Sequence, residues 1–157
     1  MEVLVTNSFY YNKKSMKKNN KSFLSFSFSQ GFVSPNIPIA TFYQGDKELH
    51  FIVDTGSDNN VINRDTLNGI KYEMIEHNGT LAGVGGVYQV EACRIQFQLE
   101  DEEFTAKFLI SDNLKEAFDA IRKEHAICIH GMLGSRFLME NNIVLDFNSM
   151  TAYNKKQ

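Results

Sequence analysis

The segment FIVDTGSDNNVI, residues 51–62, constrains the fold more than any other part of the chain. It begins with three apolar residues that do not alternate with polar ones, a pattern that predicts a strand covered on both faces. Asp54 follows at once, and Thr55-Gly56 then turns the chain. We therefore expect a carboxylate at the edge of an apolar wall, where an ionised group needs a partner because burying a lone charge costs free energy.

Two structural roles for Asp54 are open on these residues alone. An Asp before a Gly commonly caps a turn by accepting a hydrogen bond from the backbone two residues later. A buried Asp also commonly forms half of a salt bridge. Because a motif of three residues is a weak signal, the rest of the chain has to decide between a structural and a catalytic carboxylate.

The remaining sequence predicts short strands at close spacing. IPIATFYQ and ELHFIVD flank the turn Gln44-Gly45-Asp46, which is typical of a β-hairpin. Residues 79–90, 94–100 and 104–111 predict further antiparallel strands. Strand-like segments also occur at AICIHGML and in a closing hairpin built from NIVLDF and MTAY. In FLSFSFSQ, the apolar side chains alternate with serines, so one more strand is expected near residue 26.

Two helices are expected within this β pattern. Leu114, Ala117, Phe118 and Ile121 recur at helical spacing after the capping pair Ser111-Asp112, and the helix should end near His125 and serve packing. A shorter helix should open at Ser135. The predicted fold class is thus mainly β with one or two helices.

Length and charge narrow the class of protein. The 157 residues suffice for one domain with its own core, and we expect a basic arm and strand over 1–33 followed by the domain over 34–157. Residues 1–30 carry +4 and the remainder −7, within a net charge of −3, which favours neither nucleic acid nor an anionic membrane. No apolar run approaches the roughly 20 residues of a membrane span. Residues 16–28 lack a continuous apolar segment, so no secretory signal is predicted and a cytoplasmic location is expected.

Three segments together resemble the retropepsin-like aspartic peptidases, over roughly residues 35–153. FIVDTGSDNNVI resembles the catalytic loop of that family. LAGVGGVYQV resembles its flap, with the tip at Gly83, Val84, Gly85 and Gly86. GMLGSRFL, residues 131–138, is similar to the apolar-apolar-Gly stretch that precedes a helix in the family. Order and spacing agree for all three segments, and a motif gains weight when its context fits.

The resemblance implies an aspartic endopeptidase with the closed β-barrel of an acid protease half. Because the chain contains one Asp-Thr-Gly, the resemblance also implies a homodimer in which two Asp54 carboxylates meet and share a proton. Asp54, Thr55 and Gly56 would then be catalytic. Ser57 and Asp58, with the flap tip Gly83 to Gly86, would contact an extended polypeptide substrate. No metal and no cofactor is implied.

Two positions depart from the family pattern. Ser57 stands where many retroviral members carry Ala, and we expect its hydroxyl to donate to the Asp54 carboxylate. In retroviral relatives, an Arg follows the Gly of the third segment and pairs with the acid at the position of Asp58. Here Ser135 takes that place and Arg136 comes one residue later, so the pairing of Arg136 with Asp58 is left open.

Other interpretations of these motifs are weaker. The glycines at 83–86 are followed by no Lys-Ser or Lys-Thr, which argues against a phosphate loop. His125, Cys128 and His130 lack a fourth zinc ligand, so packing is the better prediction for them, and the two cysteines, both in strand-like contexts, indicate no disulfide framework. The alternative function is a dimeric peptide-binding or adaptor module that has lost turnover. The intact Asp-Thr-Gly favours the enzyme, since a binding module does not need a buried carboxylate pair.

Overall fold

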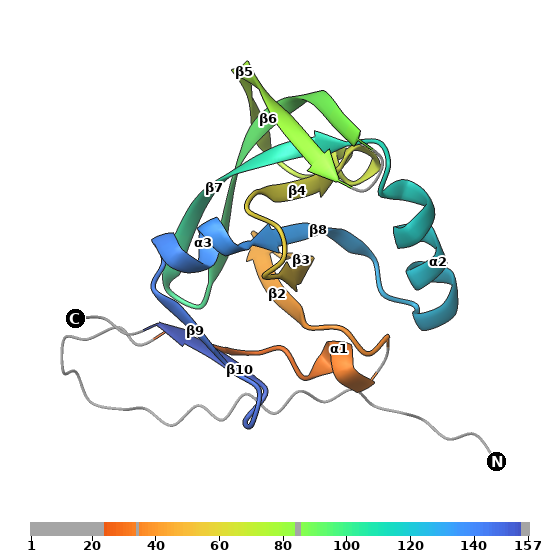
Figure 1. Ribbon diagram of the computed structural model, residues 1–157. Helices are drawn as coiled ribbons and strands as arrows, with labels where there is room; N and C mark the ends of the chain where they lie inside the picture. Colours follow the sequence, from red (N-terminus) through yellow and green to blue (C-terminus); the bar gives the residue numbers. More distant parts are fainter. Residues whose placement is uncertain (1–23, 34, 84–85, 155–157) are drawn as a thin grey trace.

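The computed structural model describes residues 24–33, 35–83 and 86–154 and shows a mainly β protein (Figure 1). One sheet has three strands in the order β1-β10-β9, and the other has seven in the order β2-β3-β8-β4-β7-β6-β5. The three-stranded sheet consists of β1 (Ser25–Ser27), β9 (Ile143–Asp146) and β10 (Thr151–Asn154). The seven-stranded sheet consists of β2 (Ile39–Gln44), β3 (Lys47–Asp54), β4 (Asn60–Asn63), β5 (Tyr72–Gly83), β6 (Gly86–Leu99), β7 (Glu102–Ser111) and β8 (Ile129–Gly134).

Four short helical segments accompany the sheets. They are α1 (Gln30–Val33), the 3-10 helix η1 (Arg64–Leu67), α2 (Lys115–His125) and α3 (Ser135–Glu140). Figure 1 shows the β5–β6 hairpin at one end of the molecule and the three-stranded sheet with α1 at the other. Within the ranges that the structure describes, no helix is long and apolar enough to cross a membrane.

Hairpins account for most of the seven-stranded sheet, as the sequence predicted. β2 and β3 pair antiparallel around Gly45, whose positive φ of 61° suits a glycine in a tight turn. β5, β6 and β7 follow as antiparallel neighbours. One further pairing, Tyr43 with Gln98, joins β2 to β6, and the Gln44 side chain adds hydrogen bonds to the backbone of Lys71 and Gln96. The first strand of the sheet is therefore tied to strands near the opposite edge.

Two parallel pairings had no counterpart in the sequence prediction. β3 pairs parallel with β8, and β4 pairs parallel with β7. β8 thereby lies between β3 and β4, although more than sixty residues separate it from either strand. Local turn chemistry predicts hairpins, whereas parallel partners come from distant parts of the chain and leave no local signal.

Phenylalanines fill the main core between the two sheets. Phe42 on β2 is fully buried, and its ring lies 5.0 Å from that of Phe97 and 5.4 Å from that of Phe26, centroid to centroid. Further rings within 6.2 Å of Phe42 are those of Phe51, Phe104 and Phe137. Phe26 belongs to β1, so this contact fastens the three-stranded sheet to the larger one. The predicted alternation is confirmed, since Leu24, Phe26 and Phe28 are buried while Ser25 and Ser27 are exposed.

A second, smaller core lies under α2. Phe118 packs there with Ile39 and Ile129, and Ile52 lies at its margin. Because Phe51 faces the main core and Ile52 this second one, β3 is covered on both faces, as predicted. The predicted cap is wrong in detail: Leu114 occupies the N-cap position, and the Ser111 hydroxyl instead accepts a hydrogen bond from the Asn113 N–H at 3.2 Å. The chain makes a separate turn before the helix begins.

The two cysteines lie in different surroundings. Cys93 is buried on β6, and burial raises the pKa of its thiol to about 11. Cys128 is exposed and precedes the first residue of β8. The strand prediction is therefore correct for Cys93 and wrong for Cys128, because β8 starts only where its backbone meets β3. Both thiols are free.

A buried histidine links β8 to β3. His130 is 5% exposed, and its Nδ1 accepts a hydrogen bond from the His50 N–H at 3.1 Å. Burial, together with the nearby His50 and Lys47, lowers the pKa of His130 to about 4. His130 is therefore neutral in the folded protein at neutral pH.

This histidine should make stability depend on pH. Between pH 6.5 and 4 the unfolded chain binds a proton at residue 130 that the folded chain does not bind, so stability falls as the pH drops and is unaffected above about pH 7. The expected loss between pH 7 and 5 is about 2 kcal/mol. Urea denaturation across this range would measure it. His130→Asn, which keeps an acceptor near the His50 N–H, should give a flatter curve; parallel curves for the two proteins would contradict the assignment.

Candidate active site around Asp54

Asp54 is the last residue of β3 and lies beside Gly134, the last residue of β8. Because side chains alternate along a strand, Asp54 shares a face with His50 and Ile52 and not with the main core. Its side chain is half-buried, whereas Thr55 and Gly56 are exposed. The strand thus ends by presenting a carboxylate at the margin of the apolar interior.

The hydrogen bonds of Asp54 are local. Its Oδ1 accepts from the Gly56 N–H at 3.0 Å, and its carbonyl accepts from the Ser57 N–H at 3.3 Å. The turn-capping role is therefore present. Among the residues that the structure describes, Asp54 has no basic partner, so the salt-bridge interpretation is wrong. Capping occupies one carboxylate oxygen and leaves the other for different chemistry.

The loop after Asp54 is held by the β8–α3 junction. The Ser57 carbonyl accepts from both the Ser135 N–H, at 2.7 Å, and the Ser135 hydroxyl, at 3.0 Å. The Asn60 side chain, 8% exposed, accepts from the Gly134 N–H at 2.9 Å and donates to the Lys107 carbonyl at 3.0 Å. These bonds fix the backbone on both sides of the loop, as a site that must hold a side chain in one position requires.

Sequence reasoning did not single out Asn60 as a site residue. Its signal was present, because an amide directly before the apolar pair at 61 and 62 would be buried with them and would need partners. Those partners lie on β7 and at the end of β8, which the sequence does not connect to residue 60.

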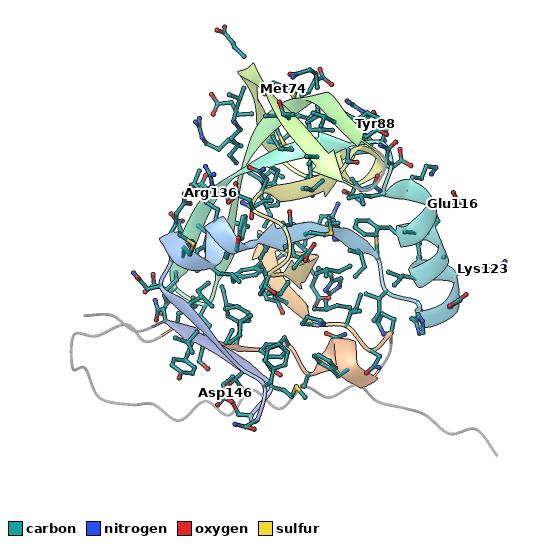
Figure 2. The ribbon with its side chains drawn as sticks, in the orientation of Figure 1. Met74, Tyr88, Glu116, Lys123, Arg136 and Asp146 are labelled. Carbon is teal, nitrogen blue, oxygen red and sulfur yellow. The ribbon has the colours of Figure 1, made fainter. Side chains whose placement is uncertain are left out.

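Arg136 does pair with Asp58, the interaction that the sequence left open. Its guanidinium donates to the Asp58 carboxylate at 2.8 Å, and its backbone N–H donates to the Asp58 carbonyl at 3.3 Å. Figure 2 shows Arg136 projecting from α3 at the surface. Both side chains are more than half exposed, so the pair orients the loop and adds little to stability.

The predicted hydrogen bond from Ser57 to Asp54 is not formed. The Ser57 hydroxyl instead donates to the Asn59 carbonyl at 2.8 Å. The tight turn directs this side chain forward along the loop, and the Gly56 N–H takes the place at the carboxylate. Ser57 therefore shapes the loop without contacting the acid.

The predicted flap corresponds to the β5–β6 hairpin. Gly83 and Gly86 form its last pair, and Gly86 has a φ of 120°. Val84 and Gly85, also predicted as flap residues, lie outside the described residues. Val87 and Tyr88 are 69% and 45% exposed on the β6 arm, where Figure 2 labels Tyr88. An apolar, solvent-facing hairpin arm can contact another polypeptide.

The described ranges contain no group of three or more His, Cys, Asp or Glu side chains that could hold a metal ion. His130, one of the three residues considered for zinc, is committed to backbone hydrogen bonds with His50 and Cys128.

Comparison with known proteins found no matching family model and no matching curated protein. Among solved structures, one match is the EIAV protease in complex with the inhibitor HBY-793, with a TM-score of 0.49 and 20% sequence identity. The match covers 68% of this chain and 89% of that protease.

The close approach at Gly134 generates a prediction. A Cβ at this position would lie 2.5 Å from the Asn59 carbonyl oxygen and 2.8 Å from that of Ser57. Both are backbone atoms and cannot rotate away, so Gly134→Ala should shift the loop and cost roughly 2 kcal/mol of stability. Chemical denaturation would measure the loss.

Gly56→Ala is the matched comparison. Its added Cβ would meet only the Asp54 Oδ1, at 3.2 Å, which is the end of a side chain that can adjust. Its loss should be less than half of that for Gly134→Ala. Equal losses would mean that Gly134 is not specifically required by the loop packing.

Proposed function

We propose that this chain is one subunit of a homodimeric, retropepsin-like aspartic endopeptidase that hydrolyses peptide bonds of an extended polypeptide. The supporting observation is the state of Asp54: a half-buried carboxylate at a strand end, with one oxygen held by the Gly56 N–H and no cation paired to it within the described residues. A structural Asp at such a position would gain most from a basic partner. A catalytic carboxylate must instead remain free to exchange protons.

The chemistry requires two carboxylates in different protonation states. An ionised Asp54 would take a proton from a water molecule, and the protonated Asp54 of a second copy would donate a hydrogen bond to the scissile carbonyl. Water then attacks the carbonyl carbon and forms a tetrahedral intermediate. Collapse of this intermediate breaks the C–N bond as a proton passes to the leaving amine.

The second carboxylate has to come from another molecule. The sequence contains a single Asp-Thr-Gly. The nearest loop carboxylate, Asp58, is paired with Arg136, and Asp65 is paired with Lys115. A two-fold axis beside Asp54 would supply an identical loop, because a symmetric dimer places the same surface on both sides of its interface.

An unpaired strand edge supports association. β9 has one partner, β10, so its other edge ends the three-stranded sheet within the described residues. Two large apolar side chains flank this strand in sequence: Met139 on α3 is 75% exposed and Phe147 is 54% exposed. Exposed edges of this kind readily pair with another chain. α3 connects β9 directly to Gly134 and hence to the active-site loop.

The β5–β6 hairpin would act as the flap. Gly83 and Gly86, the last pair of the hairpin, would allow it to open and close over a substrate, and its backbone could bind an extended peptide as an added strand. The exposed Val87 and Tyr88 give that arm apolar contact surface. Thr55 and the loop residues Ser57 and Asp58 complete the proposed substrate-facing wall.

Cleavage of a peptide library by the full chain tests the proposal. We expect turnover that a statine-type inhibitor blocks and that Asp54→Asn reduces at least about a thousandfold, since that change removes the proton-transfer group of both subunits. Asp46→Asn is the matched control, because Asp46 is exposed in the β2–β3 turn. Peptide binding without cleavage in the wild-type protein would instead support the adaptor function.

The dimer generates a separate prediction. If each active site needs two copies of Asp54, adding excess Asp54→Asn subunits should lower the activity per wild-type subunit roughly in proportion to the share of wild-type chains in the mixture. The measurement is cleavage rate against mixing ratio, with Asp46→Asn subunits added as the control. An unchanged rate, together with a monomer in analytical ultracentrifugation, would refute the shared site.

A further inference from the structure

A cavity lies at the end of β3 opposite to Asp54. It has a volume of about 260 Å³, and its polar lining includes Lys47, Asn63, Asp65, Lys115, Asp119 and Arg122. Lys47 begins β3 and Asp54 ends it, so eight residues of extended chain place the two roughly 23 Å apart. The volume corresponds to roughly eight or nine waters, which suits a small metabolite.

Asn63 is the first feature that calls for a ligand. Its side chain is 4% exposed, and its Oδ1 has no hydrogen-bond donor among the described residues. The neighbouring Thr66 hydroxyl is engaged with the carbonyls of Asn63 and His130, at 2.7 and 2.9 Å. Buried carbonyl oxygens are rarely left without a donor. A ligand hydroxyl would supply one after a small movement of the amide.

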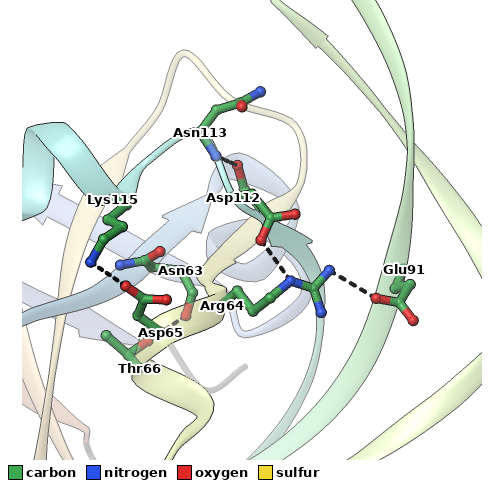
Figure 3. A network of polar contacts seen from close by, with 9 residues as sticks. Asn63, Arg64, Asp65, Thr66, Glu91, Asp112, Asn113 and Lys115 are labelled. Carbon is green, nitrogen blue, oxygen red and sulfur yellow. Dashed lines mark hydrogen bonds and ion pairs between the residues drawn. The ribbon is translucent and has the colours of Figure 1, made fainter.

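The charges around the cavity are the second feature. Lys115 pairs with both Asp65, at 2.5 Å, and Asp119, at 3.2 Å, and Figure 3 shows Asn63 beside the Lys115–Asp65 pair. Within the part of the chain that the structure describes, Lys47 and Arg122 have no carboxylate partner; Lys47 donates to the Gly69 carbonyl at 3.0 Å. The lining thus holds three cations and two carboxylates, and this surplus of positive charge favours an anionic ligand.

Helix α2 presents its charged side to this cavity. Lys115, Asp119 and Arg122 follow at spacings of four and three residues, which places them along one face of the helix. Residues of η1 and of the start of β8 also line the cavity. A metal ion fits poorly, because both carboxylates are already paired with Lys115 and the described residues contain no cluster of three ligating groups.

From these features we infer a binding site for a small hydroxylated phosphate monoester. Arg122 and Lys47 hold the phosphate, which carries nearly two negative charges at neutral pH. Asn63 Oδ1 accepts from a ligand hydroxyl, and the Asp65 and Asp119 carboxylates, both paired with Lys115, accept from others. The site is separate from Asp54 and does not depend on the proposed protease function.

Isothermal titration calorimetry of the full chain with glycerol 3-phosphate tests the site. We expect saturable binding of one molecule per chain. n-Propyl phosphate, which has the same phosphate and chain length without hydroxyls, should bind at least about tenfold more weakly because it leaves Asn63 Oδ1 unpaired. Inorganic phosphate should also bind at least about tenfold more weakly. Equal affinity for all three probes would identify a plain anion site and overturn the monoester assignment.

Variants locate the binding. Arg122→Gln and Lys47→Gln should each weaken glycerol 3-phosphate binding at least about tenfold, since each removes a charge-assisted hydrogen bond to phosphate. Lys123→Gln is the matched control: Lys123 neighbours Arg122 on α2, is exposed (Figure 2) and does not line the cavity. Asp54→Asn should bind like the wild type. Absence of saturable binding up to about 10 mM, or unchanged affinity in both cavity variants, would overturn the proposal.

Discussion

The pairing of β3 with β8 is the interaction on which the rest of the structure depends. It places Gly134 beside Asp54 and brings the start of α3 against the loop that follows Asp54. The loop is then held by the Ser135 N–H and hydroxyl, which donate to the Ser57 carbonyl, and by the Asn60 side chain, which accepts from the Gly134 N–H. A carboxylate at a strand end acquires a fixed position only because its neighbours belong to a distant, parallel strand.

The aromatic core joins the two sheets. Rings from both sheets meet around Phe42, so the short β1 strand is tied to the seven-stranded sheet by packing, with no backbone pairing between the two sheets. This arrangement brings β1 beside β10 and leaves β9 at an edge. The same organisation that completes the core therefore leaves β9 with one unpaired edge within the described residues.

Strand β3 connects two different chemical environments. At one end, Asp54 is half-buried and has no cationic partner among the described residues. At the other, Lys47 borders a cavity where cations exceed carboxylates and where no described residue donates to the Asn63 side-chain oxygen. Between them, His50 and His130 join β3 to β8 by a hydrogen bond that requires a neutral imidazole. Asp54 and the cavity are thus connected by one strand, while the other residues around each come from separate parts of the chain.

The sequence by itself determined what depends on local periodicity and turn chemistry: the hairpins around Gly45 and after β9, helix α2 with Phe118 inward, the alternation of Leu24, Phe26 and Phe28, and the placement of Asp54 in a turn. Contacts between distant segments were decided only by the tertiary structure. These include the parallel pairing of β3 with β8 and that of β4 with β7. They also include the hydrogen bonds of Asn60, the partner of Arg136 and the direction of the Ser57 hydroxyl. Periodicity reports which face of an element is buried, but it carries no information on which remote backbone lies opposite, and that neighbour fixes where each polar side chain bonds.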